Sequence, residues 1–477
     1  MKFGKYIKKA TALTAAAALS VTAAISASAA EDISFFEQAA QRDANGNKPG
    51  YVDLATIPNG NVHQQLYNDL YQECIDFWNS NVDVEPLKLD DGAGNGYNLF
   101  IFKAIPASQI IPGMTKAETA EQQYELLAEG YKFFMNYMAD NPIFYFLYSM
   151  KVTLVNTDDK TLFLILIPEE YASGSDRAAV QSNIIDFYGQ APALTEGKST
   201  LAQKHMALYQ YLCDNMTYAY QKDENGNYIL DDAGNKVESF EAFAHTIVAP
   251  AVNKEGVCEG YARSYELLCN LAGLESVFSV GACYDPSDSS QFFGHAWNYI
   301  KLDDGNFYGI DATWDDQIQE DENLRNNPAF ALNVIDGKSH VYFGDGKTRF
   351  LNGRKDCDHN TQTEFGTTRE IGGKSIFVKV TNFFEYEIDQ IAGVARPDYD
   401  YVMPGDVNND LEFDMRDLIR LGKFTVNPSE THVAKAAANA DGIGEINMLD
   451  AVHLQKSLLG YESNVPQVDV ENYPSRT

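Results

Sequence analysis

The spacing of apolar residues along the first half of the chain predicts an alternation of helices and strands. Apolar positions three and four residues apart, typical of amphipathic helices, form stripes at 63–78, 115–138, 177–188 and 200–215. Thr115-Lys116-Ala117-Glu118 has the pattern of a capping box and is expected to open the second helix. Alternating or continuous apolar runs predict strands at 87–89, 97–103, 142–155 and 161–168.

Turn signals and alternation extend the prediction toward the C-terminus. Two clusters of Asn, Asp and Gly between 222 and 237 predict a surface excursion. Polar and apolar residues alternate at 376–380, so residues 340–390 are expected to complete the sheet of the same unit.

The stretch after Cys258 predicts one more helix. Ala262, Tyr265, Leu268, Cys269 and Ala272 stand at helical spacing, and the glycine at 273 suits a C-cap. Cys258 therefore falls at or near a helix N-terminus. Unpaired amides and the helix dipole there favour the thiolate over the thiol, and the thiolate is the nucleophilic form.

Two β-rich runs, 294–302 and 306–314, flank the turn signal at 303–305 and predict a hairpin. The length of the loop decides the chemistry. A two-residue turn would place His295 and Asp311 on opposite faces of the ribbon. A three-residue loop with a left-handed Gly305 places Trp297 opposite Asp311 and His295 diagonal to it on the same face. We predict the odd-length loop.

Taken singly, each of these residues is more often structural than catalytic, but the combination is specific. The gaps of 37 residues (295 − 258) and 16 residues (311 − 295) leave room for a helix, a strand and a hairpin. The three segments, Cys258-Glu259-Gly260-Tyr261-Ala262, His295-Ala296-Trp297-Asn298 and Asp311-Ala312-Thr313-Trp314-Asp315, resemble the signatures of the transglutaminase-like cysteine-enzyme superfamily.

That resemblance implies an α+β fold with a papain-like core, in which a helix bearing the cysteine packs on an antiparallel sheet. It implies that Cys258 attacks a carbonyl carbon, His295 shuttles the proton and Asp311 holds the imidazole. No cofactor is implied for catalysis. The backbone N–H of Cys258 is a candidate oxyanion donor because it lies at the helix start. Trp297 and Trp314 are expected either to flank the cleft or to pack across the hairpin.

The first thirty residues have the pattern of a secretory signal peptide. A start with four lysines precedes an alanine-rich stretch, and Ala27-Ser28-Ala29 or Ser28-Ala29-Ala30 suits cleavage. We therefore expect a secreted, extracellular protein with no membrane anchor. The formal net charge is −32, and loss of those lysines takes it to −36 (−32 − 4). So acidic a chain disfavours nucleic acid and anionic membranes as partners.

The chain has six cysteines, at 74, 213, 258, 269, 283 and 357. If Cys258 stays free, five remain and cannot all pair. Cys74, Cys213 and Cys269 fall on apolar helical stripes, which favours buried thiols. Cys283 and Cys357 are the one pair to consider for a disulfide.

A repeat of loop and helix follows residue 404. Oxygen-bearing residues occupy positions one, three, five, nine and twelve of an EF-hand-type calcium loop: Asp406, Asn408, Asp410, Asp414 and Asp417. The segment 412–417 recurs as 445–450, 33 residues later (450 − 417). The second loop offers fewer charges and is expected to bind calcium more weakly, through Asn439, Asp441, Asn447 and Asp450.

Residues 404–463 resemble a type I dockerin, the module that attaches bacterial cellulosomal enzymes to cohesin domains of a scaffold. The resemblance implies a small all-α fold that depends on Ca²⁺. The family's recognition positions correspond to Met415-Arg416 and Met448-Leu449, which differ from the usual hydroxyl pair. Leu411 also stands where glycine is usual.

The sequence therefore predicts a signal peptide (1–30), a lead-in (31–62), a catalytic unit with an N-terminal α/β extension (63–395, core about 196–395), a linker (396–403), a dockerin (404–463) and a tail (464–477). The favoured function is a cysteine peptidase or amidase acting on peptide or isopeptide carbonyls through a thioester. Protein-glutamine cross-linking and a non-catalytic, scaffold-bound binding protein remain alternatives. The expected partners are a cohesin domain and a protein or peptide substrate, in a setting of polysaccharide degradation.

Overall fold

The computed structural model describes residues 60–90, 96–148, 151–232, 234–285, 288–325, 334–335, 338–345, 358–360, 365–371, 374–380, 404–461 without 409, 411, 430 and 432, and 466–467. The predicted signal peptide and linker, and nearly all of the predicted lead-in and tail, lie outside these ranges. None of the helices within them has both the length and the apolar character needed to cross a lipid bilayer.

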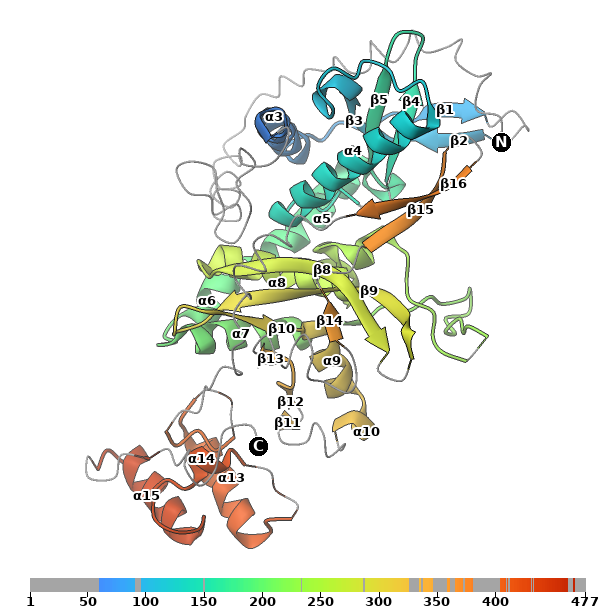
Figure 1. The fold of residues 1–477 in the computed structure, drawn as a ribbon. Helices are drawn as coiled ribbons and strands as arrows, with labels where there is room; N and C mark the ends of the chain where they lie inside the picture. The colour runs from blue at the N-terminus through green and yellow to red at the C-terminus, as the bar shows by residue number, and fades with distance from the viewer. Residues whose placement is uncertain are drawn as a thin grey trace.

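The N-terminal region combines two long helices with a small antiparallel sheet (Figure 1). The helices are α3 (Gly60–Trp78) and α4 (Ala120–Asp140), with the short helix η4 (Ala107–Gln109) between them. The strands β1 (Leu87–Asp90) and β2 (Gly96–Leu99) pair as an antiparallel hairpin, at the positions where strands were predicted from residues 87 and 97. A second sheet has the order β3-β5-β4, formed by Ile101–Pro106, Thr161–Leu166 and Val152–Asn156.

The start of α4 differs from the prediction. Thr119 caps this helix, and Gln122 completes the capping box, so the pattern at Thr115 does not open it. Thr161 explains the difference: its N–H donates to the carbonyl of Thr115, and its hydroxyl accepts from the N–H of Ala117. These tertiary hydrogen bonds hold the chain before Thr119 against β5 and delay the helix.

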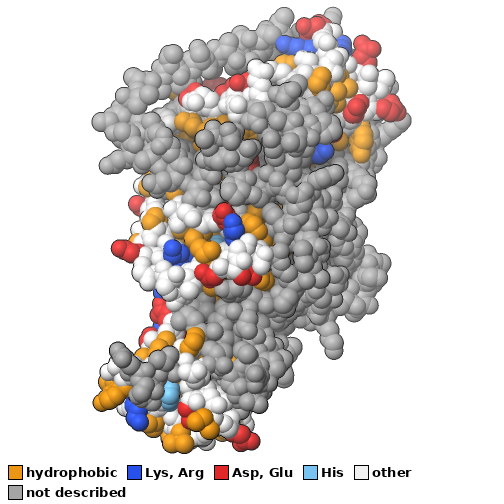
Figure 2. Space-filling view, turned by 60° about the vertical axis from the view of Figure 1, so that its left-hand side comes forward, with side chains coloured by type: hydrophobic (Ala, Val, Ile, Leu, Met, Phe, Trp, Pro, Cys, Tyr) orange, Lys and Arg blue, Asp and Glu red, His pale blue; other side chains and the backbone are white. Residues whose placement is uncertain are grey.

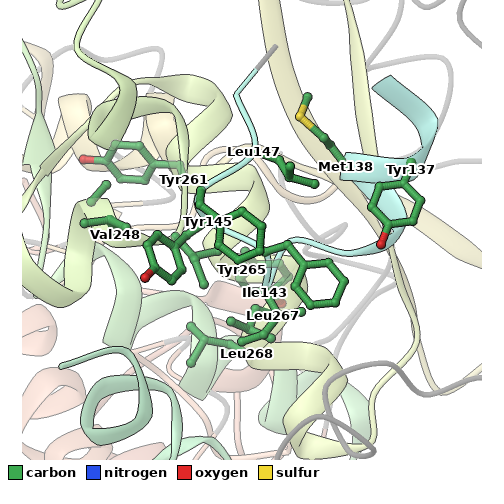
Figure 3. Packing of buried hydrophobic residues seen from close by; sticks show 14 of the residues in the cluster. Tyr137, Met138, Ile143, Tyr145, Leu147, Val248, Tyr261, Tyr265, Leu267 and Leu268 are labelled. Carbon is green, nitrogen blue, oxygen red and sulfur yellow. The ribbon is translucent and has the colours of Figure 1, made fainter. Parts of the chain in front are cut away.

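The apolar run that follows α4 was predicted as a strand, but residues 142–147 form consecutive tight turns and are buried. A continuous apolar run indicates burial without deciding between extended and turned backbone. Figure 3 shows Ile143, Tyr145 and Leu147 packed in one cluster with Tyr265 and Leu268 of the cysteine-bearing helix. The N-terminal region therefore supports that helix from behind.

The middle of the chain is mainly helical. Its helices are α5 (Gly174–Tyr188), α6 (Ala191–Thr195), α7 (Leu201–Cys213) and α8 (Cys258–Ala272), with the short turns η5 (Glu169–Tyr171), η6 (Ala242–His245) and η7 (Ala249–Asn253). Two short strands, β6 (Thr217–Tyr218) and β7 (Glu255–Gly256), pair in parallel just before α8. Between them, residues 220–238 form the predicted excursion, closed by isolated bridges such as Lys222 to Tyr228.

The main sheet is antiparallel, with the order β13-β10-β9-β8-β14. Its strands are Phe343–Asp345, Phe307–Ile310, Asp288–Lys301, Ser276–Asp285 and Asp358–Asn360. Helix α8 packs against β8 and β9, as Figure 1 shows. The expected helix on an antiparallel sheet is therefore present.

The hairpin of β9 and β10 confirms the predicted odd-length loop. Tyr308 pairs with Ile300 and Ile310 with Asn298. The N–H of Leu302 bonds to the carbonyl of Asn306, and Gly305 has φ +78°. The second strand ends at residue 310 rather than at 314, because Asp311 caps the helix α9 (Ala312–Glu320). The short helix α10 (Glu322–Arg325) follows.

Residues 340–390 complete the main sheet only in part. β13 and β14 join its two edges, whereas β15 (Phe365–Ile371) and β16 (Lys374–Val380) form a separate hairpin that contacts α4. A further hairpin consists of β11 (Val334–Ile335) and β12 (Lys338–Ser339). Alternation predicts a strand but does not name its partner, and for this reason the expectation for 376–380 was wrong.

The C-terminal region is a small set of helices, α13 (Met415–Val426), α14 (Lys435–Ala438) and α15 (Met448–Leu458). Helices α13 and α15 pack on each other around a small cluster that includes Val407, Leu421 and Leu454. Several apolar side chains stay exposed here, and Figure 2 shows hydrophobic side chains gathered at this end of the molecule.

Candidate active site

Cys258 is the first residue of α8, as predicted, and its side chain is partly exposed. The N–H of Val257 donates to the carbonyl of Ala244 at 2.9 Å, which holds the entry to the helix against η6. Gly260 is required for this approach, because a Cβ there would lie 2.3 Å from the Ala244 carbonyl oxygen. The predicted C-cap is also present at Gly273, with φ +72°.

His295 and Asp311 lie together in the buried part of the site. His295 Nε2 is 2.7 Å from Asp311 Oδ2, so Nδ1 is the ring nitrogen left for the thiol of Cys258. The other oxygen of Asp311, Oδ1, accepts from the N–H of Trp314 at 3.1 Å and caps α9. One carboxylate therefore fixes both the imidazole and the start of a helix.

The electrostatics of the site favour a protonated imidazole. Burial works to lower the pKa of His295, but the charge and hydrogen bond of Asp311, followed by the interaction with Cys258, raise that pKa to about 10. The structure thus brings the three predicted residues into one group, with the proton on His295 at neutral pH.

The two predicted tryptophans differ in their positions. Trp314 lies on α9, not on a strand, and its ring stacks on the imidazole of His295 with centroids 4.6 Å apart and an angle of 11° between planes. Trp297 is buried, and its ring centroid is 5.9 Å from that of His295. Trp314 is therefore the partly exposed wall beside His295, whereas Trp297 supports the histidine from within the core.

Tyr218 belongs to the same site and was not singled out from the sequence. Burial, and next the charge of Cys258, raise the pKa of its phenol well above the ordinary value. The phenol therefore stays protonated and lies within electrostatic reach of the sulfur. The parallel pairing of Tyr218 with Gly256 brings it there, and no local pattern in the sequence announces a two-residue parallel strand.

A second charged group surrounds the residue after the cysteine. Glu259 bonds to Arg263 at 2.8 Å and to His245 Nδ1 at 3.1 Å. Arg263 also donates to the carbonyl of Met138 at 2.6 Å, which ties α8 to the end of α4. Burial opposes ionisation, but Arg263 and then His245 bring the pKa of Glu259 down to about 2. The first turn of α8 is thus fixed by an ion-paired network.

Asp315 is the last residue of the third quoted signature, and its structural role is clear. Its carboxylate accepts hydrogen bonds from the hydroxyls of Tyr209 and Ser339, both at 2.6 Å, and from the N–H groups of Val341 and Tyr342 at 2.9 and 3.0 Å. These bonds hold the segment before β13 on α9. The ring of Tyr342 in turn contacts Trp314 edge-on at 5.1 Å.

The cysteines outside the site agree with the predicted burial. Cys74, Cys213 and Cys269 are buried and free. The side chain of Cys283 and the whole of Cys357 lie outside the described residues, so the suggested pair is not among the described contacts.

The two C-terminal loops share one hydrogen-bonding scheme. Asp417 Oδ1 accepts from the N–H of Asn408 at 3.1 Å, and Asp450 Oδ1 accepts from the N–H of Asp441 at the same distance. Asp414 and Asn447 cap the following helices, each with a capping box closed by Asp417 or Asp450. The duplicated sequence is thus a duplicated structure.

The candidate metal-ligand atoms of the first loop are side-chain oxygens, the ligand type that calcium prefers. The N–H of Asp410 donates both to Asp406 Oδ1 and to Asn408 Oδ1 at 3.1 Å, so these two oxygens converge on one amide. Arg416 pairs with Asp410 and Asp414 at 2.9 Å each and supplies the local positive charge. Within the ranges given above, no three carboxylate, imidazole or thiol groups lie together closely enough to hold a metal ion.

The four positions expected to contact a cohesin lie at the starts of α13 and α15. Met415, Met448 and Leu449 are all more than half exposed, at 57%, 53% and 65%. Arg416 is exposed as well but is held by the carboxylates of its own loop.

Comparison with known proteins supports part of this description. Residues 189–312 match the family model of the transglutaminase-like superfamily, so the chain contains a transglutaminase-like superfamily domain. The kyphoscoliosis peptidases of Mus musculus and Homo sapiens are each 39% identical to it over 62 residues. That segment is 12% of this chain and spans only 9% of the length of each curated relative.

Two solved structures show a limited likeness. One is a crystal structure of a TGase, with 17% identity, 34% of this chain and 43% of that chain covered, and a TM-score of 0.21. The other, from Cytophaga hutchinsonii, is assigned as a cysteine protease, with 14% identity, 33% and 55% covered, and a TM-score of 0.18.

Proposed function

We propose that this chain is a secreted cysteine peptidase or amidase that hydrolyses peptide or isopeptide bonds. The observation that carries the proposal is the buried contact of His295 with Asp311 at 2.7 Å, beside a partly exposed cysteine at a helix start. A nucleophile, a base and a group that orients the base are the parts that acyl transfer needs.

The reaction follows from these positions. The sulfur of Cys258 attacks the carbonyl carbon, a C–S bond forms, and the carbonyl π electrons move to the oxygen. When this intermediate collapses, the C–N bond breaks and the amine leaves with the proton of His295. Water then attacks the thioester carbonyl while His295 takes one of its protons. The C–S bond breaks, the carboxylic acid product departs, and the Cys258 thiolate is left paired with the protonated His295.

The oxyanion requires two donors. The N–H of Cys258 is one, because the first amides of a helix have no acceptor within the helix. We assign Tyr218 as the second, because its pairing with Gly256 brings it beside the helix start; its phenol, which also bonds to Glu238, would turn toward the oxyanion. Asp311 keeps the imidazole turned toward Cys258 through its hydrogen bond to Nε2.

The proposal extends to the C-terminal region, which we take to be a dockerin that binds a cohesin domain. Asp406, Asn408, Asp410, Asp414 and Asp417 would hold one calcium ion, and Asn439, Asp441, Asn447 and Asp450 would hold a weaker second one. The ion would supply positive charge to the buried carboxylates. The exposed Met415, Met448 and Leu449 support a docking role for the same end.

Activity on two kinds of acceptor tests the first part. The full chain is mixed with a glutamine-containing peptide and a fluorescent primary amine, and with peptide substrates alone. We expect cleavage that is lost in Cys258→Ala. Incorporation of the amine instead would show that the thioester is resolved by lysine-like amines, which is the cross-linking alternative. A Cys258 unreactive toward iodoacetamide at neutral pH, with neither activity, would remove the enzymatic proposal.

Capture on immobilised cohesins tests the second part. We expect retention with calcium and release with a chelator, and loss of retention in the double variant Met415→Asp with Met448→Asp. Retention that a chelator does not affect would contradict a calcium-dependent dockerin, whatever the outcome for the enzyme.

A further inference from the structure

A cavity of about 400 Å³ lies between the end of α7, strand β6 and helix α9. Its buried lining includes Cys213, Met216 and Asp316, and its exposed rim carries Asp214, Lys254 and Glu320. The floor is therefore apolar except for one carboxyl group, and charged groups surround the opening.

Asp316 is the unusual member of this lining. The residue is 1% exposed, its Oδ2 accepts a hydrogen bond from the hydroxyl of Tyr261, and its Oδ1 is buried with no hydrogen-bond partner in the described part of the chain. The adjacent Asp315 provides the contrast, because four donors satisfy it. Leaving a buried acceptor unsatisfied is unfavourable, and more so when the group is charged.

The lysine on the rim does not neutralise Asp316. The ammonium of Lys254 donates to the carbonyl of Pro250 and lies 4.9 Å from the ring centroid of Phe187. Asp214 has its own partner, Lys338. Among the described residues, Asp316 and Glu320 are thus the cavity carboxyl groups without an ion pair.

The raised pKa values of Asp316 and Glu320 indicate that no nearby positive charge among the described residues stabilises their ionised forms. Burial, reinforced by the acidic neighbours Glu320, Asp214 and Asp315, raises the pKa of Asp316 to about 8, against the lowering effect of Tyr261. Burial likewise raises the pKa of Glu320, which Lys236 lowers only at a distance. The ammonium of Lys236 lies over the ring of Tyr228 instead, 4.1 Å from its centroid.

The cavity adjoins the candidate active site through two elements. Thr217 lines it, and the next residue, Tyr218, lies within electrostatic reach of Cys258. On the other side, the partner of Asp316 is Tyr261, which lies in the first turn of α8 together with Cys258. The cavity and the candidate active site therefore share β6 and the start of α8 as neighbouring elements.

We propose that the cavity binds the ammonium group of a substrate lysine side chain, with Asp316 and Glu320 as acceptors. Cys213 and Met216 would contact its methylene groups. The assignment of the ligand as a substrate group rests on the proposed function, whereas the binding of an alkylammonium does not.

Direct binding tests the proposal without turnover. The probes are Nα-acetyl-lysine amide and its uncharged isostere Nα-acetyl-norleucine amide, titrated by NMR into the full chain carrying Cys258→Ala. We expect the lysine probe to bind and the norleucine probe to bind at least about tenfold more weakly, since hydrogen bonds to charged groups contribute about 1.5–3 kcal/mol. Because a bound cation favours the ionised carboxylate, affinity should rise between pH 6 and 9.

Two variants locate the site. Asp316→Asn retains an acceptor for Tyr261, and Glu320→Gln lies on the exposed rim where folding is not at risk. Each should weaken the lysine probe by about tenfold, whereas Asp69→Asn, an exposed carboxylate on α3, should change nothing. Equal binding of both probes, or full affinity in both variants, overturns the proposal. Tighter binding of the arginine analogue overturns the choice of lysine. Loss of hydrolysis with intact lysine binding would count against the enzyme, not against this site.

Discussion

The catalytic region and the C-terminal region are stabilised in different ways. Behind α8 lies one large cluster of buried residues, rich in Tyr and Phe, that extends from α3 to β13. Among the described residues, the C-terminal cluster has seven buried ones, three of them alanine. Asp406, Asp417 and Asp450 are buried close to it. Apolar packing holds the candidate catalytic residues in place in the first region. In the second region, hydrogen bonds to buried carboxylates hold the two loops in place.

The two regions are therefore destabilised by different kinds of substitution. In the catalytic region a polar group can be exchanged without loss of the fold, because packing of large side chains dominates its stability. In the C-terminal region the buried carboxylates need a positive charge, since an uncompensated buried charge is strongly unfavourable.

Cys258→Ala should abolish peptide hydrolysis and leave the fold intact. Removing the nucleophile of such a group costs about 10⁴-fold or more in kcat, while the side chain is partly exposed and adds little to the core. The measurements are steady-state kinetics and thermal unfolding followed by tryptophan fluorescence. A variant that loses its cooperative transition together with its activity would show that the site and the fold are not separable.

Asp311→Asn should lower kcat by about 10²–10⁴-fold and change the pH profile. Asp311 is the main group raising the pKa of His295 to about 10. Without it, burial lowers that pKa, so the alkaline limb of the plot of kcat against pH moves to lower pH. The same shift predicts a loss of stability. The raised pKa contributes stability that is complete below about pH 6.5 and is lost as pH rises through about 10.

The control for this variant is Asp315→Asn, on the helix that Asp311 caps, because its carboxylate accepts from Tyr209, Ser339 and the N–H groups before β13. It should destabilise the segment before β13 without moving the alkaline limb. If Asp311→Asn leaves the limb in place, the charge of Asp311 does not set the pKa of His295, and the assigned role of Asp311 is wrong.

The sequence predicts the features that depend on neighbouring residues and misses those that depend on residues far apart in the chain. The position of Cys258 at a helix start and the hairpin register came from local spacing and a turn with Gly305, and both are confirmed. The cap at Thr119, the turns at 142–147 and the partners of β16 depend on contacts with distant residues. Tyr218 and Asp316 were missed for the same reason, because what makes them notable is their interaction with Cys258 and Tyr261 on α8, which are distant in sequence.

Calcium removal should affect the C-terminal region alone. A ligand present at about 1,000 times its Kd stabilises the folded state by about 4 kcal/mol, so a chelator should shift the calorimetric transition of residues 404–461 downward. The three tryptophans, Trp78, Trp297 and Trp314, all belong to the other region. Tryptophan fluorescence should therefore report an unchanged transition, and a parallel shift in both signals would contradict two separately stabilised regions.

Arg416→Gln should strengthen calcium binding at the first loop. Its guanidinium pairs with Asp410 and Asp414 and must be displaced by the ion. Pairs this exposed contribute about 1 kcal/mol or less, so the gain in affinity should be up to about fivefold, measured by calorimetric titration. Arg420→Gln, on the same helix, is the matched control. If both variants change calcium affinity equally, the effect comes from net charge and not from the ion pairs of Arg416.

Lys198→Ala should have the smallest effect and tests whether the two regions act as one. Lys198 lies just before α7, and Glu412 lies in the first calcium-type loop. The two side chains form an ion pair between the two regions. Both side chains are partly exposed, at 26% and 39%, so solvent screening limits the pair to roughly 0–1 kcal/mol. Both unfolding transitions should move by no more than in Lys435→Ala, an exposed lysine on α14. A shift of the tryptophan-reported transition that disappears at high salt would mean that this ion pair couples the regions, because screening removes exposed charge interactions first.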